Sequence, residues 1–186
     1  IHLDVMDGKF VPNISFGAPV ISSVRKITNA IFDVHLMIEE PIRYLNDFVK
    51  AGADIITVHY EACTDAANTL QEIHKAGLKA GLAISPDTPV SVLKPFLKEV
   101  DMILIMSVHP GFGGQSFIEE SLNKIEDTRS MLQECGRDDV WIEVDGGIGT
   151  ANITKVKDAG ANVFVAGSAV FKGDMVANTK QLLALI

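Results

Sequence analysis

The sequence of 186 residues has little of several features that mark particular classes of protein. Its two cysteines, Cys63 and Cys135, fit neither a metal-binding spacing nor a disulfide framework. No apolar run reaches the roughly 18–20 residues that a membrane span needs, and no cationic segment leads into an apolar one as in a signal peptide. Basic residues are outnumbered 16 to 24 by acidic ones, which are scattered. We therefore expect a reduced, cytoplasmic location, and neither nucleic acid nor a membrane as a partner.

The composition and a repeated joint predict one globular α/β domain. With 47% hydrophobic and 22% charged residues, the chain can bury a core of ordinary size. Three times, a helix end is followed by glycine and a short apolar run, at Gly52, Gly77 and Gly160. Glycine closes a helix in the left-handed conformation, and the apolar run suits a strand that is buried on both faces. We expect a single domain over residues 1–186.

The alternation predicts seven parallel strands separated by helices. The expected strands are Ile1–Met6, Ile31–Met37, Asp54–Tyr60, Lys79–Ile84, Asp101–Ser107, Val140–Asp145 and Asn162–Ala166. The amphipathic stretches between them, each long enough to cross back over a sheet, are Pro41–Ala51, Asp65–Ala76, Val90–Val100, Ile118–Cys135 and Ala151–Ala159.

Polar residues at the strand ends decide between two α/β architectures. They are Asp4, His35, His59, Ser85, Ser107, Asp145 and Ser168. A (β/α)₈ barrel draws its active site from many strand ends, whereas an open sheet uses one switch point, so we expect the barrel. Seven strands do not close it, because eight is the rule for this fold. We expect the first strand and helix to be absent from this sequence, and a seven-stranded variant stays open as the alternative.

Two histidines and two aspartates are candidate metal ligands. Alternation along the first strand puts His2 and Asp4 on one side, and His35 lies at matching depth on the next strand. Asp145 ends an apolar strand that runs into glycines. Two imidazoles and two carboxylates suit zinc, iron(II), cobalt or manganese better than calcium or magnesium. Taken singly, each residue is more often a capping or loop-tethering group at a strand end, but their common depth and inward phase favour a metal site.

Three glycine-rich segments, 110–116, 145–147 and 166–169, are candidates for binding an anion. Their backbone N–H groups can turn toward a phosphate without obstruction, and barrels hold phosphate in the loops after their final strands. One such turn alone is more often a tight loop, but three in succession favour a phosphate cradle. Met6, Met37 and Met106 end strands in the inward phase. An apolar floor for a flat intermediate and ordinary core packing are equally open for them.

A metal with two separated carboxylates suggests proton transfer next to a carbonyl group. The metal would stabilise a developing enediolate, while one carboxylate removes a proton and the other returns one. Asp4 and Asp145 are the candidates for these roles. If they lie on opposite faces of a bound sugar, the reacting carbon inverts.

Five segments of the chain resemble one known family. They are HLDVMDGKFVPN at 2–13, DVHLM at 33–37, VHPGFGGQ at 108–115, EVDGGI at 143–148 and VAGSAVF at 165–171. In this order they resemble ribulose-phosphate 3-epimerases. The resemblance implies a metal-dependent isomerase that interconverts D-ribulose 5-phosphate and D-xylulose 5-phosphate through a 2,3-enediolate, in the pentose phosphate pathway and carbon fixation. It also allows association into a homo-oligomer.

The resemblance assigns roles to particular residues. The implied metal ligands are His2, Asp4, His35 and Asp145, of which Asp4 and Asp145 are also the acid/base pair. The implied substrate-binding residues are His35, Gly111, Phe112, Gly113, Gly114, Asp145, Gly146, Gly147, Gly167 and Ser168. The family's first strand, with a serine that touches the substrate, and its first helix have no counterpart in this sequence.

Three other functions remain open from the sequence. An epimerase of a ketohexose 6-phosphate such as allulose 6-phosphate would use the same metal and carboxylates, although the intact GFGGQ and DGGI runs favour the pentose substrate. A lyase or decarboxylase on a similar barrel would want a lysine on the strand between two aspartates, and Lys9 lies beyond that strand. A non-catalytic, truncated barrel would fold without a metal. His59 and Glu61 receive no role.

Overall fold

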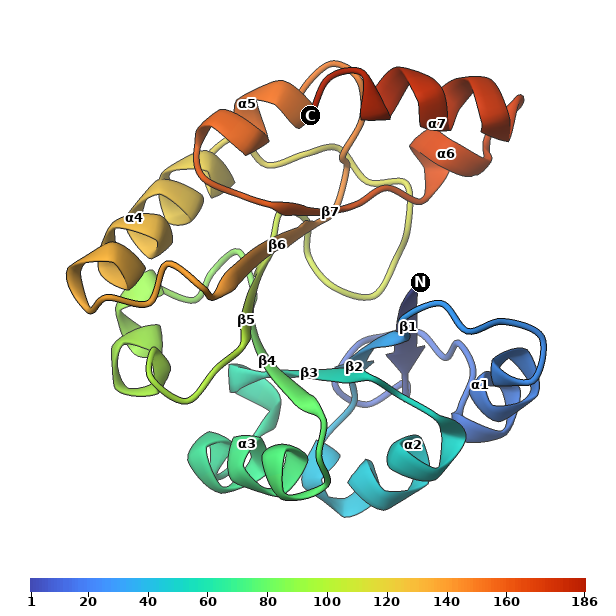
Figure 1. Ribbon diagram of the computed structural model, residues 1–186, viewed down its shortest axis with the longest axis vertical. Helices are drawn as coiled ribbons and strands as arrows, with labels where there is room; N and C mark the ends of the chain where they lie inside the picture. The colour runs from blue at the N-terminus through green and yellow to red at the C-terminus, as the bar shows by residue number, and fades with distance from the viewer. The chain divides into compact units, whose positions relative to one another are not determined.

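The computed structural model describes residues 1–186, which divide into two compact units (Figure 1). The first unit is Ile1–Ala83 with Glu99–Met102, and the second is Ile84–Lys98 with Ile103–Ile186. Each unit is described by itself. No helix in either unit is long and apolar enough to cross a membrane. The prediction of a single domain over residues 1–186 stays a prediction.

The first unit carries four parallel strands in the order of the sequence. They are β1 (His2–Met6), β2 (Asp33–Met37), β3 (Ile55–His59) and β4 (Lys79–Ile84), which ends where the second unit begins. The connecting helices are α1 (Ala18–Arg25), a 3₁₀ turn at Pro41–Tyr44 that leads into α2 (Leu45–Ala51), and α3 (Ala66–Lys75). These helices cover one face of the strands, as Figure 1 shows for α1, α2 and α3. The candidate site lies on the other face of these strands, which α1, α2 and α3 do not cover.

Glycine at the end of α2 shows how one helix-to-strand joint is built. Gly52 has a φ of 94°, and its N–H donates to the carbonyl oxygens of Phe48 and Val49. An added Cβ would lie 2.5 Å from Cδ of Arg25, so both the backbone conformation and the space require glycine. The joint turns the chain from α2 directly into β3, as the repeated sequence pattern predicted.

The second unit carries the strands β5 (Met102–Met106), whose first residue belongs to the first unit, β6 (Trp141–Asp145) and β7 (Val163–Val165). They are joined by α4 (Ser121–Glu134) and α5 (Ile153–Asp158), and α6 (Ser168–Phe171) and α7 (Met175–Leu183) follow. The strands β6 and β7 are parallel, with Asp145 beside Val165. A 3₁₀ helix at Val90–Phe96 precedes β5.

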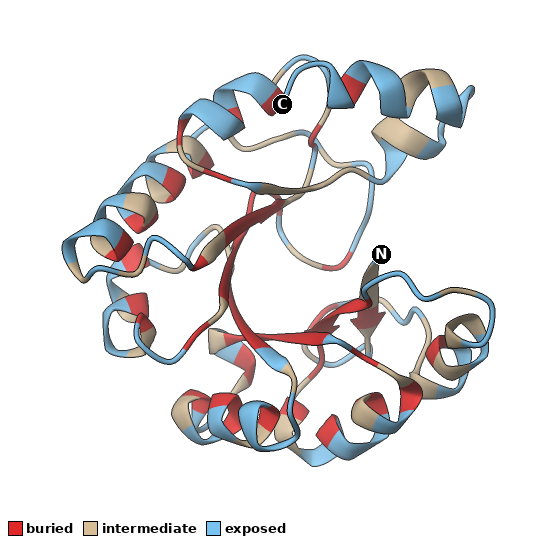
Figure 2. Cartoon of the chain, viewed as in Figure 1, coloured by how far each residue is buried: buried red, intermediate tan, exposed pale blue.

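The core of each unit lies along its strands. Every residue of β2, β3 and β5 is buried, and the helices turn their polar faces to solvent (Figure 2). Strands buried on both faces are typical of parallel sheets covered by helices. This explains the nearly continuous apolar runs that marked the strands in the sequence.

The predicted strands are confirmed, with ends that differ by at most two residues, and the helices agree less closely. The stretch Val90–Val100 forms a 3₁₀ helix over Val90–Phe96 rather than an α-helix, because Pro95 has no N–H to donate and blocks the regular turn. The expected helix from Ile118 begins three residues later, at Ser121. The helices α1 and α7 had no place among the expected stretches, whereas a short helix does start at Ser168 as expected.

Candidate metal centre and active site

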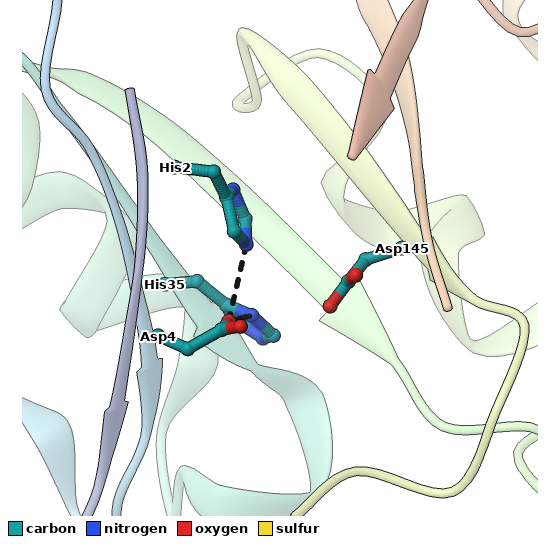
Figure 3. Close-up of side chains that lie close together, drawn as sticks. All are labelled: His2, Asp4, His35 and Asp145. Atoms are coloured by element: carbon teal, nitrogen blue, oxygen red, sulfur yellow. Dashed lines mark hydrogen bonds and ion pairs between the residues drawn. The ribbon is translucent and has the colours of Figure 1, made fainter. Parts of the chain in front are cut away.

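The register between β1 and β2 brings three of the candidate ligands together. Asp4 pairs with His35 across the two strands, and His2 lies two residues before Asp4 on the same side of β1. Oδ1 of Asp4 lies 3.2 Å from Nε2 of His2 and 2.9 Å from Nδ1 of His35 (Figure 3). One carboxylate oxygen therefore faces a ring nitrogen from each of two neighbouring strands.

Burial and hydrogen bonding set the charges in this cluster. Burial lowers the pKa of the fully buried His35 to about 4, and the hydrogen bond with Asp4 only partly offsets this effect. Burial alone would raise the pKa of Asp4, but the hydrogen bonds and positive charge offered by His2 and His35 outweigh it and lower that pKa well below its usual value. At neutral pH this favours a neutral imidazole beside a carboxylate, which are the forms that bind a metal ion.

The three side chains fit a divalent ion. His2, Asp4 and His35 each offer one ligand atom, and these atoms lie within 4.8 Å of one another. Ligand atoms around a tetrahedral ion with bonds of about 2.1 Å lie roughly 3.4 Å apart, close to the two distances between Asp4 and the ring nitrogens. Two imidazole nitrogens with a carboxylate oxygen suit zinc or a first-row transition metal. The first unit thus contains a candidate centre for a divalent metal.

Each histidine of the cluster also has a partner on the side of its ring that faces away from Asp4. Oδ2 of Asp33 lies 2.5 Å from Nδ1 of His2. Nε2 of His35 lies 2.9 Å from Nε2 of His59, whose Nδ1 lies 3.2 Å from Oε2 of Glu61. The sequence alone assigned none of these outer partners a role. The signal that could have found Asp33 is its spacing of two from His35 on one strand.

The fourth expected ligand, Asp145, is the last residue of β6 in the second unit and is drawn in Figure 3. The backbone N–H of Ser107 donates to the carbonyl oxygen of Asp145 at 2.8 Å. The hydroxyl of Ser107 donates to the carbonyl oxygens of Asp145 and Gly146 at 3.0 and 2.6 Å. The end of β6 is thereby tied to the end of β5, which fixes the backbone that carries the Asp145 carboxylate.

The glycines of two predicted phosphate loops adopt conformations that other residues rarely reach. Gly146 and Gly147 have φ values of 125° and 65°, and a Cβ on either would lie 2.5 Å from an atom of Val108 or Phe117. In the earlier loop, Gly111 and Gly114 also have positive φ. The side-chain amide of Gln115 donates to the carbonyl oxygens of His109 and Phe112 and holds this loop in shape.

The remaining predicted residues lie as follows. Gly113 is exposed, with nothing within 4 Å of the place that a Cβ would take, and Gly167 precedes the short helix α6 that begins at Ser168. Met37 and Met106 are buried in the core, and Met6, which pairs with Met37 across β1 and β2, is half-buried.

Lys9 is exposed and forms an ion pair with Glu39. Because Lys9 lies at the surface in an ion pair and not on a strand between two aspartates, the lyase or decarboxylase alternative is not favoured.

Parallel strands each followed by a helix, with imidazoles and carboxylates at strand positions of one face, define an enzyme of the (β/α)₈ TIM-barrel class. A solved structure of 3-keto-L-gulonate-6-phosphate decarboxylase from Vibrio cholerae matches 100% of this chain and 98% of its own, with a TM-score of 0.69 and 15% identity, and supports this fold. The model of the ribulose-phosphate 3 epimerase family matches residues 1–171. The chain belongs to this family.

Individual relatives agree with the family match. The ribulose-phosphate 3-epimerase of Bacillus subtilis is 51% identical over 171 residues, which are 92% of this chain and 79% of the relative. The enzyme of the same name from Synechocystis is 54% identical over 173 residues, which are 92% of this chain and 75% of the relative. The chain is thus an epimerase of the isomerase class, as its sequence motifs predicted.

Proposed function

We propose that this protein inverts C3 of D-ribulose 5-phosphate to give D-xylulose 5-phosphate, with a divalent metal ion held by His2, Asp4, His35 and Asp145. The observation that carries the proposal is the Asp4 carboxylate, whose Oδ1 faces a ring nitrogen of His2 and one of His35 in a chain of the epimerase family. Asp145, which ends β6, would complete the ligand set. The donor set admits zinc, iron(II), cobalt or manganese.

The acid/base chemistry is assigned to two carboxylates. When bound, the ion would polarise the substrate carbonyl and stabilise the negative charge of the 2,3-enediolate. Asp4, kept ionised by its two histidine neighbours, is able to accept the C3 proton from one face of the sugar. Asp145 delivers a proton to the same carbon from the other face. One carboxylate gains a proton and the other loses one, so the net reaction is inversion without oxidation or reduction.

The phosphate of the substrate is assigned to the glycine loops. Positive φ at Gly111, Gly114, Gly146 and Gly147 turns backbone N–H groups in directions that side chains do not obstruct. The full set proposed for substrate binding is His35, Gly111, Phe112, Gly113, Gly114, Asp145, Gly146, Gly147, Gly167 and Ser168. The three methionines Met6, Met37 and Met106 are proposed as an apolar floor for the planar enediolate.

The test is metal content together with epimerase activity on D-ribulose 5-phosphate, detected by coupled consumption of D-xylulose 5-phosphate. The protein should contain about one divalent ion per chain and turn over, and Asp145→Asn should lose activity by at least about 10³-fold because one acid/base group is removed. Asp127→Asn, an exposed aspartate on α4, is the matched control and should retain full activity. A parent protein with neither metal nor turnover would refute the proposal.

A further inference from the structure

A second histidine pair lies behind the candidate metal centre, away from Asp4. His59 ends β3 and is fully buried, with its Nε2 2.9 Å from Nε2 of His35. The two ring planes differ by 25°, with centroids 5.0 Å apart. Phe10 packs on the His59 ring with centroids 4.8 Å apart, and Oε2 of Glu61 lies 3.2 Å from Nδ1 of His59. The His59 ring is therefore held in one orientation by three neighbours.

With a metal ion bound between Asp4 and His35, the contacts dictate which nitrogens carry protons, because the ion takes the lone pair of Nδ1 of His35. Two ring nitrogens 2.9 Å apart need one N–H donor and one lone pair between them. The carboxylate of Glu61 can only accept, so Nδ1–H of His59 donates to it, and Nε2 of His59 is the acceptor in the pair with His35. Consequently Nε2 of His35 carries the proton in this pair. The same tautomer puts the lone pair of His35 on Nδ1, toward the bound ion, whereas in the metal-free protein Nδ1 donates to the Asp4 carboxylate.

The tautomer of His2 is fixed in the same way, with the carboxylate of Asp33 as the acceptor. With a metal ion bound, Nδ1–H of His2 donates to the carboxylate of Asp33, and the lone pair of His2 is on Nε2, the atom on the side of Asp4 and the ion. With a cation bound among His2, Asp4 and His35, each of the histidine contacts described above has one donor and one acceptor. Outer partners that orient ligand imidazoles in this way are typical of metal sites.

We propose that His59, itself oriented by Glu61, is a positioning residue for His35. It accepts the Nε2–H of His35, fixes the tautomer that presents Nδ1 to the metal, and holds the ring in line with the site. This role rests on the metal centre of the proposed function and extends it to a residue that touches neither metal nor substrate. Replacing His59 should weaken metal binding while the protein remains folded.

The test compares two replacements of His59 in a Co(II) titration followed by visible absorption. His59→Gln keeps an acceptor that His35 can reach, and His59→Phe keeps the aromatic volume but removes the acceptor. We expect His59→Phe to bind Co(II) about 10- to 100-fold more weakly than the parent, and His59→Gln to recover most of the loss. His74→Gln is the control, since His74 lies on α3 and pairs with Asp101, which is not part of the cluster.

A second measurement needs no variant. In the zinc-loaded protein, ¹⁵N NMR should find His35 protonated on Nε2, with Nδ1 bound to the ion. Protonation on Nδ1, unchanged Co(II) affinity in a folded His59→Phe, or equal losses in His59→Phe and His59→Gln would each overturn the positioning role while the parent remains an active metalloenzyme. A parent that binds no ion and has no turnover would overturn the proposed function as well.

Discussion

The carboxylate of Asp33 holds His2 through a contact of 2.5 Å between Oδ2 and Nδ1. The two residues face each other across β1 and β2, and both side chains are largely buried. An acceptor-only carboxylate on Nδ1 keeps a proton there, so that Nε2 of His2, which faces Asp4, can present its lone pair to a metal ion. The register of the first two strands thus fixes both the position and the tautomer of a candidate ligand.

The first prediction concerns this pair. In Asp33→Asn, the new amide can donate to Nδ1 of His2, which would move the ring proton to Nε2, the atom that faces Asp4. We expect the metal affinity to fall about 10- to 100-fold. The measurement is competition for zinc against a chelator of known affinity. Asp101→Asn is the control, because Asp101 accepts from His74 in a similar histidine–carboxylate pair elsewhere in the first unit, and its metal affinity should equal that of the parent.

The second prediction compares two glycines that end helices with positive φ. Gly52→Ala would bring its Cβ to 2.5 Å from Arg25, which is tied by hydrogen bonds to the carbonyl oxygens of Thr28 and Ala30 and cannot move aside cheaply. Gly77→Ala meets nothing within 4 Å. We expect the free energy of unfolding to fall by about 1 kcal/mol for Gly77→Ala from the backbone alone, and by about 2–4 kcal/mol for Gly52→Ala. Urea unfolding measures both, and equal losses would contradict the steric argument.

The third prediction concerns pH. The carboxylate of Asp7 accepts from the backbone N–H groups of Lys9, Phe10 and Glu39, and these bonds outweigh the effect of burial and lower its pKa below 3.8. A lowered folded-state pKa contributes stability above the unfolded value of about 3.8, and this contribution is lost as the pH falls. Because Asp7 is exposed and solvent screens its charge, Asp7→Asn should be less stable than the parent by only about 0.5 kcal/mol at pH 7.

The difference between the parent and Asp7→Asn should shrink as the pH falls below about 4. Unfolding by urea at pH 7, 5 and 3 measures it. Asp127→Asn, at an exposed position on α4, serves as the control and should follow the parent at each pH. A difference that grows toward low pH would show that the Asp7 carboxylate is not the stabilising form.

The fourth prediction concerns thiol reactivity. Burial raises the pKa of the Cys63 thiol to about 12 from 9.0, and the nearby carboxylates add to the effect. At pH 8 the thiolate fraction falls about 10³-fold, and greater intrinsic nucleophilicity restores about 20-fold of this, so we expect reaction with a disulfide reagent to be about 50-fold slower than for a thiol of pKa 9. The rate is measured in Cys135→Ser, where Cys63 is the remaining cysteine. A rate equal to that of a simple thiol would contradict the burial of Cys63.

The sequence was sufficient for the strands because they are short apolar runs, three of which follow a helix-closing glycine, as at Gly52. It was less informative for helices that depend on packing: α1 begins without a side-chain cap, and the turn at Val90–Phe96 is decided by Pro95. Alternation along β1 and β2 was enough to place His2, Asp4 and His35 on one face. The roles of the outer partners could not be predicted, because which nitrogen of a histidine faces which acceptor depends on ring orientation and not on spacing.

The central claim, proton transfer at C3 by two carboxylates, is tested most directly by the reaction of D-ribulose 5-phosphate in D₂O. Because one carboxylate removes the proton and another supplies its replacement from solvent, D-xylulose 5-phosphate formed by the protein should carry deuterium at C3, and Asp145→Asn should form it at least about 10³-fold more slowly. Mass spectrometry and NMR of the product measure both. Product that retains the original hydrogen at C3, or undiminished turnover by Asp145→Asn, would contradict the account.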